Sequence, residues 1–85
     1  MYRVELLPTA ARQLVKLDRR VQRRMARAID ALATDPRGPN STKLRGAEDL
    51  WRIRVGDYRA LYQIQDRALV VLVAVGHRAT VYRRA

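Results

Sequence analysis

Arg52, Arg54 and Arg59 fall within one short segment of the sequence, LWRIRVGDYRALYQI. The segment indicates two strands joined by a two-residue turn at Gly56-Asp57, with glycine at the first central position as a type II′ turn requires. In that register Arg54 lies opposite Arg59, and Arg52 shares their face of the sheet. Like charges directly across a strand pair repel each other, and guanidinium groups bind phosphate or carboxylate oxygens two at a time. We therefore expect an anion-binding site on this face, the alternative being an arginine-coated face that only keeps a sheet edge soluble.

A second group of candidate residues follows the apolar segment ALVVLVAVG. If that segment is the last strand, it runs back toward the Gly56-Asp57 turn and delivers His77 and Arg78 close to the arginines of the hairpin. The tail can add Tyr82 near the same place. One end of the sheet is thus expected to gather cations with a tyrosine and the single histidine.

The composition narrows the function classes. The chain has 85 residues with 18 Lys or Arg and 8 Asp or Glu, a formal net charge of +10 at pH 7. This balance predicts a polyanionic partner, either nucleic acid or an acidic protein segment, with solubility alone as the alternative. There is no cysteine and one histidine, so we expect no metal and no cofactor. No apolar segment could span a membrane, and charges interrupt the start where a signal peptide needs an apolar run, which predicts a cytoplasmic protein with no membrane partner.

The elements that must position these residues form a single α+β domain over residues 1–85, in the order β-α-α-β-β-β. We expect an antiparallel-rich sheet packed against a two-helix hairpin. Residues 2–7 indicate the first strand, and residues 34–42 indicate a loop. Residues 68–76 are apolar on both faces, which is typical of a central strand.

The helices begin at two predicted caps. Pro8 suits the first turn of the first helix with Thr9 as its cap, and Asp18 suits the cap of the second. The second helix carries an apolar stripe opposite a surface of arginines. That surface could bind nucleic acid, but a solvated helix face is the usual meaning of such a run, and we favour it here. The apolar stripe consists of Val21, Met25, Ala28, Ile29 and Leu32. The arginine surface consists of Arg19, Arg20, Arg23, Arg24 and Arg27.

The register of the last strand pair depends on the turn that joins its two strands. With a turn at Asp66-Arg67, Ala74 would lie beside Arg59. Ala74, Gly76 and Arg78 would then share the arginine face, and a small neighbour would leave space above it.

Three segments, KLRG, LWRIRVGDYRALYQI and VGHRATVY, carry a resemblance to a known family. Together they resemble the RelE branch of the RelE/ParE toxin superfamily, over nearly the whole chain. The resemblance implies a RelE-like fold and the toxin of a type II toxin–antitoxin system. RelE-type toxins are mRNA interferases that cleave messenger RNA, typically in the ribosomal A site. An acidic RelB-type antitoxin encoded beside them neutralises them. Messenger RNA, the ribosome and such an antitoxin are therefore the expected partners.

The resemblance also implies site residues. The catalytic positions of the family fall on Arg52 and Arg54 of WRIR, Arg59 of DYR, Arg78 of GHR and Tyr82 of VY. The best-known family pattern has lysines where this chain has Arg52 and Arg54. Arginine cannot shed its proton, so these two side chains can only bind and stabilise charge. Lys43 and Arg45 of KLRG, with Arg83 and Arg84 of the tail, are expected to bind substrate.

These residues suit an endoribonuclease that needs no metal. RNA supplies its own nucleophile, the 2′-hydroxyl, and attack on phosphorus builds negative charge that Arg59, with Arg54 and Arg52, can stabilise. Tyr82 is the expected base because neighbouring cations favour tyrosinate, and Arg78 would neutralise the leaving 5′-oxygen. The product would be a 2′,3′-cyclic phosphate.

His77 is the competing candidate for proton transfer, since imidazole titrates near neutrality. Strand alternation argues against it, because His77 points away from the arginine face if the last strand extends that far. Two further functions remain open. One is a ParE-like inhibitor of DNA gyrase, and the other is a non-catalytic nucleic-acid-binding module.

Overall fold

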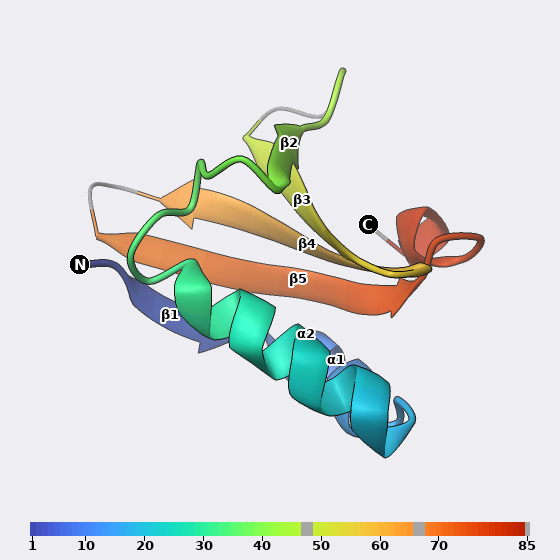
Figure 1. The fold of residues 1–85 in the computed structure, drawn as a ribbon. Coiled ribbons are helices and arrows are strands. Elements are labelled where there is room, and N and C mark those ends of the chain that lie inside the picture. The colour runs from blue at the N-terminus through green and yellow to red at the C-terminus, as the bar shows by residue number, and fades with distance from the viewer. Residues whose placement is uncertain (47–48, 66–67, 85) are drawn as a thin grey trace.

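The backbone forms five strands, two α-helices and a short 3₁₀ helix in the computed structural model, which describes residues 1–46, 49–65 and 68–84 (Figure 1). The elements in chain order are β1 (Arg3–Leu6), α1 (Pro8–Val15), α2 (Arg19–Ala31), β2 (Ser41–Lys43), β3 (Leu50–Val55), β4 (Tyr58–Gln65), β5 (Leu69–His77) and the 3₁₀ helix η1 (Val81–Arg84). The α+β class and the predicted succession of two helices between strands are confirmed. In the described part of the chain, no helix is long and apolar enough to cross a membrane.

The sheet has the strand order β1-β5-β4-β3-β2. β1 pairs with β5 in parallel, and the other three pairings are antiparallel, so the predicted antiparallel-rich sheet is confirmed. β5 lies between β1 and β4, as its apolar sequence predicts. The helices α1 and α2 cover one face of the sheet, and η1 lies beside the turn that joins β3 to β4 (Figure 1).

The main core lies between the helices and the sheet. The apolar stripe of α2 reaches it, since Met25 is fully buried and Ile29 and Leu32 are each 3% exposed. The predicted inward face of the hairpin meets this stripe, with Ala60 and Tyr62 fully buried. A second, smaller cluster of Leu61, Ala74 and Val81 lies on the other face of the sheet and attaches η1 to it. The main core therefore supports the sheet from one side and leaves the other side free for polar side chains.

The hairpin of β3 and β4 has the predicted register. Val55 pairs with Tyr58, and Arg54 pairs with Arg59. Gly56 has φ of +60°, while Asp57 has no positive φ, which agrees with a type II′ turn and excludes type I′. The turn needs glycine at this position, because other residues rarely adopt a positive φ there.

Two of the predicted boundaries are wrong. Residues 41 and 42 belong to β2, which pairs with β3, and not to the loop at 34–42. Their polar sequence carries no strand signal, and the neighbouring strand supplies the pairing. Thr9 lies inside α1, whose N-cap is Leu7, so Thr9 is not the cap. Asp18 does occupy the N-cap of α2, but within the described chain its side chain makes no capping hydrogen bond, and its carbonyl accepts the Gln22 N–H at 2.7 Å.

The predicted register of β4 and β5 is also wrong. Gly76, and not Ala74, lies opposite Arg59, and Ala74 lies opposite Leu61. The predicted turn residues Asp66 and Arg67 lie outside the described residues. The predicted turn would pair Gln65 with Ala68, but Gln65 pairs with Leu69, so the register is shifted by one residue. An irregularity between Leu61 and Tyr62 shifts the register of the following residues by one more. Two single-residue shifts add up to an even number, so Ala74 and Gly76 still share the arginine face as predicted.

Candidate active site

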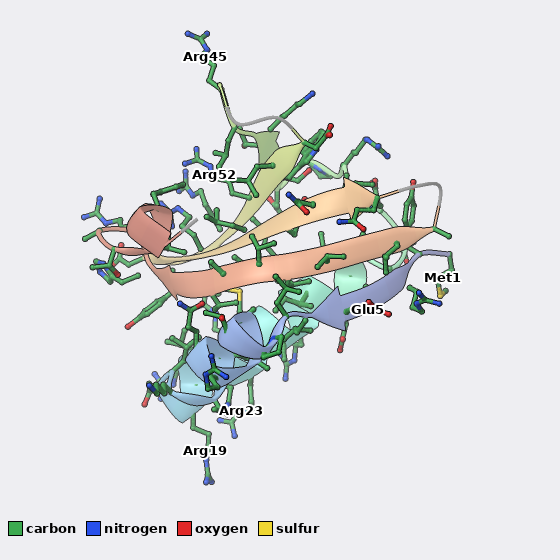
Figure 2. The ribbon with its side chains drawn as sticks, turned by 180° about the vertical axis from the view of Figure 1, so that it is seen from behind. Met1, Glu5, Arg19, Arg23, Arg45 and Arg52 are labelled. Atoms are coloured by element: carbon green, nitrogen blue, oxygen red, sulfur yellow. The ribbon has the colours of Figure 1, made fainter. Side chains whose placement is uncertain are left out.

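A pocket of about 480 Å³ opens at the end of the sheet where the β3–β4 turn, the end of β5 and η1 meet. It is lined by Arg52, Arg59, His77, Arg78, Ala79 and Tyr82. Figure 2 shows Arg52 on the side of the sheet away from the helices, whereas Arg19 and Arg23 of α2 extend in the opposite direction. The sheet thus separates the cations of the pocket from those of the helix surface.

Arg59 is held in place by its own hairpin. Its Nη1 donates hydrogen bonds to the carbonyl oxygens of Gly56 at 2.9 Å and of Tyr58 at 3.0 Å. Within the described residues its Nε is buried and has no hydrogen-bond partner. A buried donor without a partner carries a free-energy cost.

Arg52 joins β3 to the C-terminal 3₁₀ helix. Its Nη1 donates a hydrogen bond to the Tyr82 hydroxyl at 2.8 Å, a contact between residues 30 positions apart. In the part of the chain that the structure describes, the Arg52 Nε is likewise buried and unpartnered. The structure therefore brings a phenol and two guanidinium groups with unsatisfied donors into one pocket.

Arg78 lies at the mouth of the pocket, where the chain leaves β5. Its backbone N–H donates to the Asp57 carbonyl at 2.8 Å, and its Nε lies 3.6 Å from the Asp57 carboxylate. Both side chains are well exposed, so this ion pair contributes little stability. The backbone bond, which continues the β4–β5 pairing by one residue, is what sets the position of Arg78.

His77 lies at the rim with its ring turned toward the helix-covered side. The ring packs edge-on against Tyr58, with centroids 5.5 Å apart and an interplanar angle of 86°. This contact agrees with strand alternation, which places His77 on the same face as its cross-strand partner Tyr58, although His77 also lines the edge of the pocket. The Nδ1 atom accepts the Ala79 N–H at 3.1 Å, so the neutral ring carries its proton on Nε2.

Other predicted site residues lie elsewhere. Arg54 is exposed and does not line the pocket, although it sits directly opposite Arg59. Lys43 pairs with Trp51, which packs against the main core, so Lys43 lies on the helix-covered face of the sheet. Arg45 extends from the segment after β2, away from the pocket (Figure 2). The side chains of Arg83 and Arg84 lie outside the part that the structure describes.

The sequence reasoning missed two members of the site. Asp57 was expected only as a turn residue, yet it holds Arg78 through both backbone and side chain. Ala79 lines the pocket and fixes the His77 imidazole. The Asp57 contact could have been found from the strand direction, which returns Arg78 to the turn. Among the described residues, no cluster of three or more His, Cys, Asp or Glu side chains could bind a metal ion.

The chain is a small basic α+β protein with an arginine-lined pocket at one end of its sheet. Comparisons with known proteins show the family to which it belongs. The family model described as "ParE toxin of type II toxin-antitoxin system, parDE" matches residues 4–82. A RelE-like toxin protein of Escherichia coli is 35% identical over 80 residues, which cover 91% of this chain and 83% of that protein. Toxin RelG of Mycobacterium tuberculosis is 35% identical over 85 residues, with 98% of each chain covered.

A solved structure agrees with these matches. The crystal structure of the toxin–antitoxin complex RelBE2 from Mycobacterium tuberculosis contains a chain that is 33% identical, with a TM-score of 0.78. The match covers 91% of this chain and 98% of that one. The chain therefore belongs to the RelE/ParE superfamily of type II toxin–antitoxin toxins, and its relatives are RelE-type toxins. The expectations of family and fold drawn from the sequence motifs are confirmed.

Proposed function

We propose that this toxin is a metal-independent endoribonuclease that cleaves messenger RNA, in association with the ribosome, through attack by the 2′-hydroxyl of the RNA. The observation that carries the proposal is the pocket in which Arg52, Arg59, Arg78 and Tyr82 meet. A ribosome-associated activity would place the protein in the cytoplasm. Residues 1–85 would act as one domain, with no cofactor.

Charge stabilisation falls to two guanidinium groups. As the 2′-oxygen attacks phosphorus, negative charge grows on the non-bridging phosphoryl oxygens. Arg59 is already oriented by the carbonyls of its hairpin. A scissile phosphate in the pocket would lie beside the guanidinium groups of Arg59 and Arg52, which both line it.

Proton transfer falls to Tyr82. Its hydroxyl accepts a hydrogen bond from Arg52, and a cation in that position would stabilise the phenolate form, which would take the 2′-proton and become a phenol. Arg78, exposed at the pocket mouth, would stabilise the charge on the leaving 5′-oxygen, which would take its proton from water. His77 is the weaker candidate, because its Nδ1 is engaged by Ala79 and its ring packs against Tyr58. More distant parts of the RNA would be contacted by Arg54, Lys43, Arg45, Arg83 and Arg84.

The natural inhibitor of the activity would be an acidic RelB-type antitoxin. The M. tuberculosis relative was solved as a toxin–antitoxin complex. The net charge of +10 on this chain favours an acidic partner segment.

A second function is kept because one observation favours it. The matching family model carries the description of a ParE toxin, and ParE-type toxins inhibit DNA gyrase. Such an inhibitor would need the fold and an antitoxin but not the hydrogen bond between Arg52 and Tyr82. A gyrase supercoiling assay beside an RNA cleavage assay separates the two functions.

The deciding experiment compares two tyrosines that accept a hydrogen bond from an arginine. Tyr82 accepts from Arg52 in the pocket, and Tyr2 accepts from Arg37 at 3.3 Å on a remote surface. We expect Tyr82→Phe to lower the cleavage rate of ribosome-bound messenger RNA by about 10²–10⁴, as is typical of a general base. Tyr2→Phe should cleave like the wild type.

Primer extension on a defined message would map the cuts, and binding to ribosomes should be equal in all three proteins. A wild-type rate in Tyr82→Phe together with an inactive His77→Gln would transfer the role of the base to His77. Intact message in the presence of wild-type toxin, with inhibited supercoiling, would replace the ribonuclease by the gyrase inhibitor.

A further inference from the structure

One end of β5 lacks a neighbouring strand, and a side chain of α1 takes that place. β1 pairs with β5 only from Leu69 to Leu72, and the Leu7 N–H adds one last bond to the Leu72 carbonyl at 3.0 Å. The chain then turns into α1 at Pro8. From residue 73 to residue 77, no strand of the described chain lies beside β5 on this side.

The Gln13 side chain binds the backbone that β1 leaves unpaired. Its Oε1 accepts the Val75 N–H at 2.8 Å, a contact between residues 62 positions apart. Val75 is 2% exposed, and Gln13 supplies the hydrogen-bond partner that its backbone N–H would otherwise lack within the described chain. Gln13 therefore acts as a one-residue substitute for the missing strand.

The residues that follow Val75 form one wall of the pocket. Gly76 lies opposite Arg59, and His77 and Arg78 line the pocket itself. On the β4 side this segment is held by the strand pairing and by the Arg78 N–H bond to Asp57. Among the residues of α1, Gln13 alone makes a side-chain hydrogen bond to this segment, and the Thr80 hydroxyl donates a longer bond to the His77 carbonyl at 3.4 Å.

An open groove lies beside Gln13. It measures about 180 Å³ and is lined by Gln13, Lys16, Leu17, Val75, Gly76, Thr80 and Val81. The end of β5 thus has the pocket on one side and this groove on the other. The backbone bond from Arg78 to Asp57 sets the position of Arg78 from the β4 side, and the Gln13 bond adds a second support from the α1 side.

We propose that Gln13 is a positioning residue for the RNA cleavage reaction, acting on Arg78 through the backbone of Val75. The inference rests on the proposed endoribonuclease function and adds to it a residue on the opposite side of the sheet that touches no RNA. Its effect should appear in the rate of the chemical step and not in substrate binding, because the tether aligns a group without contacting the substrate.

The test uses Gln13→Met, which keeps the length of the side chain and removes the acceptor, and Gln13→Glu, which keeps an acceptor. The matched control is Gln22→Met, since the Gln22 side chain donates a comparable bond to the Leu14 carbonyl at 3.3 Å, away from the pocket. The assay is single-turnover cleavage of messenger RNA on programmed ribosomes. We expect Gln13→Met to lower the maximal rate about tenfold with the half-saturating concentration unchanged, while Gln13→Glu and Gln22→Met stay within about threefold of the wild type.

A double variant shows whether the effect passes through Arg78. In an Arg78→Ala background, Gln13→Met should cause no further loss, because the group that it aligns is gone. Should Gln13→Met fail to fold, Gln13→Asn, whose side chain is one methylene shorter, carries the same expectation.

Three results would overturn the inference. They are equal rates in Gln13→Met and Gln22→Met, a loss confined to binding, or a full tenfold loss in the Arg78→Ala background. A wild-type protein that leaves the RNA intact would overturn the proposed function and this inference together, whereas an active wild type with an active Gln13→Met overturns the inference alone.

Discussion

The three arginines of the pocket differ in how firmly they are held. Two carbonyl oxygens of the hairpin fix Arg59, the Tyr82 hydroxyl binds Arg52, and Arg78 has an exposed carboxylate as its side-chain partner. Electrostatic catalysis is most effective when the stabilising group is oriented before the reaction begins. Arg59 is thus the side chain best suited to stabilise a transition state, and Arg78 the one most free to follow a leaving group.

Replacement of Arg59 should show this difference. We expect Arg59→Ala to lower the RNA cleavage rate by about 10²–10³, the usual effect of removing one preorganised charge contact. Arg23→Ala removes an equal charge from the exposed surface of α2, on the other side of the sheet, and should change the rate less than about threefold (Figure 2). Cleavage rates with matched circular dichroism spectra provide the measurement. Equal losses in the two variants would mean that overall charge, and not the pocket, carries the activity.

Tyr62 links the sheet to the loop after α2 and should make the fold sensitive to alkaline pH. Its hydroxyl donates to the Pro36 carbonyl at 2.6 Å, and burial raises the pKa of Tyr62 above its ordinary value of 10.0. A raised pKa in the folded state means that the stabilisation is complete below about pH 10 and is lost as the pH rises through the folded-state pKa.

We expect Tyr62→Phe to lower the free energy of unfolding by about 1 kcal/mol near neutral pH, since one buried hydrogen bond is lost. The difference between the two proteins should shrink above about pH 10. Urea titrations at several pH values measure it. A difference that stays constant up to strongly alkaline pH would contradict the assignment to the Tyr62 hydroxyl.

The sequence predicted which face of the sheet the pocket arginines occupy better than it predicted which of them line the pocket. Strand alternation placed Arg52 and Arg59 on one face correctly, and strand direction brought Arg78 to them. Alternation does not tell how far along the strand a pocket extends, so it could not separate Arg54 from Arg52. The face on which Lys43 lies was not predictable, because the three-residue strand β2 is too short to give an alternation signal.

At the scale of elements, the pairing of β4 with β5 contains an irregularity between Leu61 and Tyr62 that no sequence signal predicts. In the first part of β5, Val70 and Leu72 face the helices, and after the irregularity Val75 does so. An apolar run such as ALVVLVAVG hides this change, because every position accepts either face. The faces of the pocket were predictable in spite of it, since the two single-residue shifts add up to two positions and so preserve the alternation of faces. The 3₁₀ helix η1 was not predicted at all.

Gly76 allows η1 to approach the sheet. A methyl group built on Gly76 would lie 3.6 Å from the Val81 Cβ, an ordinary contact, so Gly76→Ala should retain activity. Gly76→Val adds branches that must push Val81, which is 2% exposed, away from the sheet. We expect this shift to separate Tyr82 from Arg52 and to lower the cleavage rate at least tenfold. Growth arrest by the three proteins, with crystal structures of the variants, tests the prediction, and full toxicity of Gly76→Val would refute it.

At the scale of the whole molecule, the question is whether RNA meets the entire basic surface or mainly the pocket. Three pocket arginines that neutralise phosphates of single-stranded RNA would give a slope of about −2 for log affinity against log salt. The affinity should then fall roughly 20-fold between about 50 and 200 mM salt. Fluorescence anisotropy with a labelled oligonucleotide measures the slope. It should become shallower by about 0.7 in Arg59→Ala and stay unchanged in Arg23→Ala, and a wild-type slope near −7 would show that the whole surface takes part.

The parallel pairing of β1 with β5 sets an order of events during synthesis. Residues 3–6 leave the ribosome long before their partners at 69–72 are made. The sheet therefore cannot close around a nascent chain that ends before β5. The arginine and tyrosine of the pocket that follow β5 come later still. Under the proposed function, a nascent chain without these residues has no pocket, so it could not cleave its own message while the codons before them are being read.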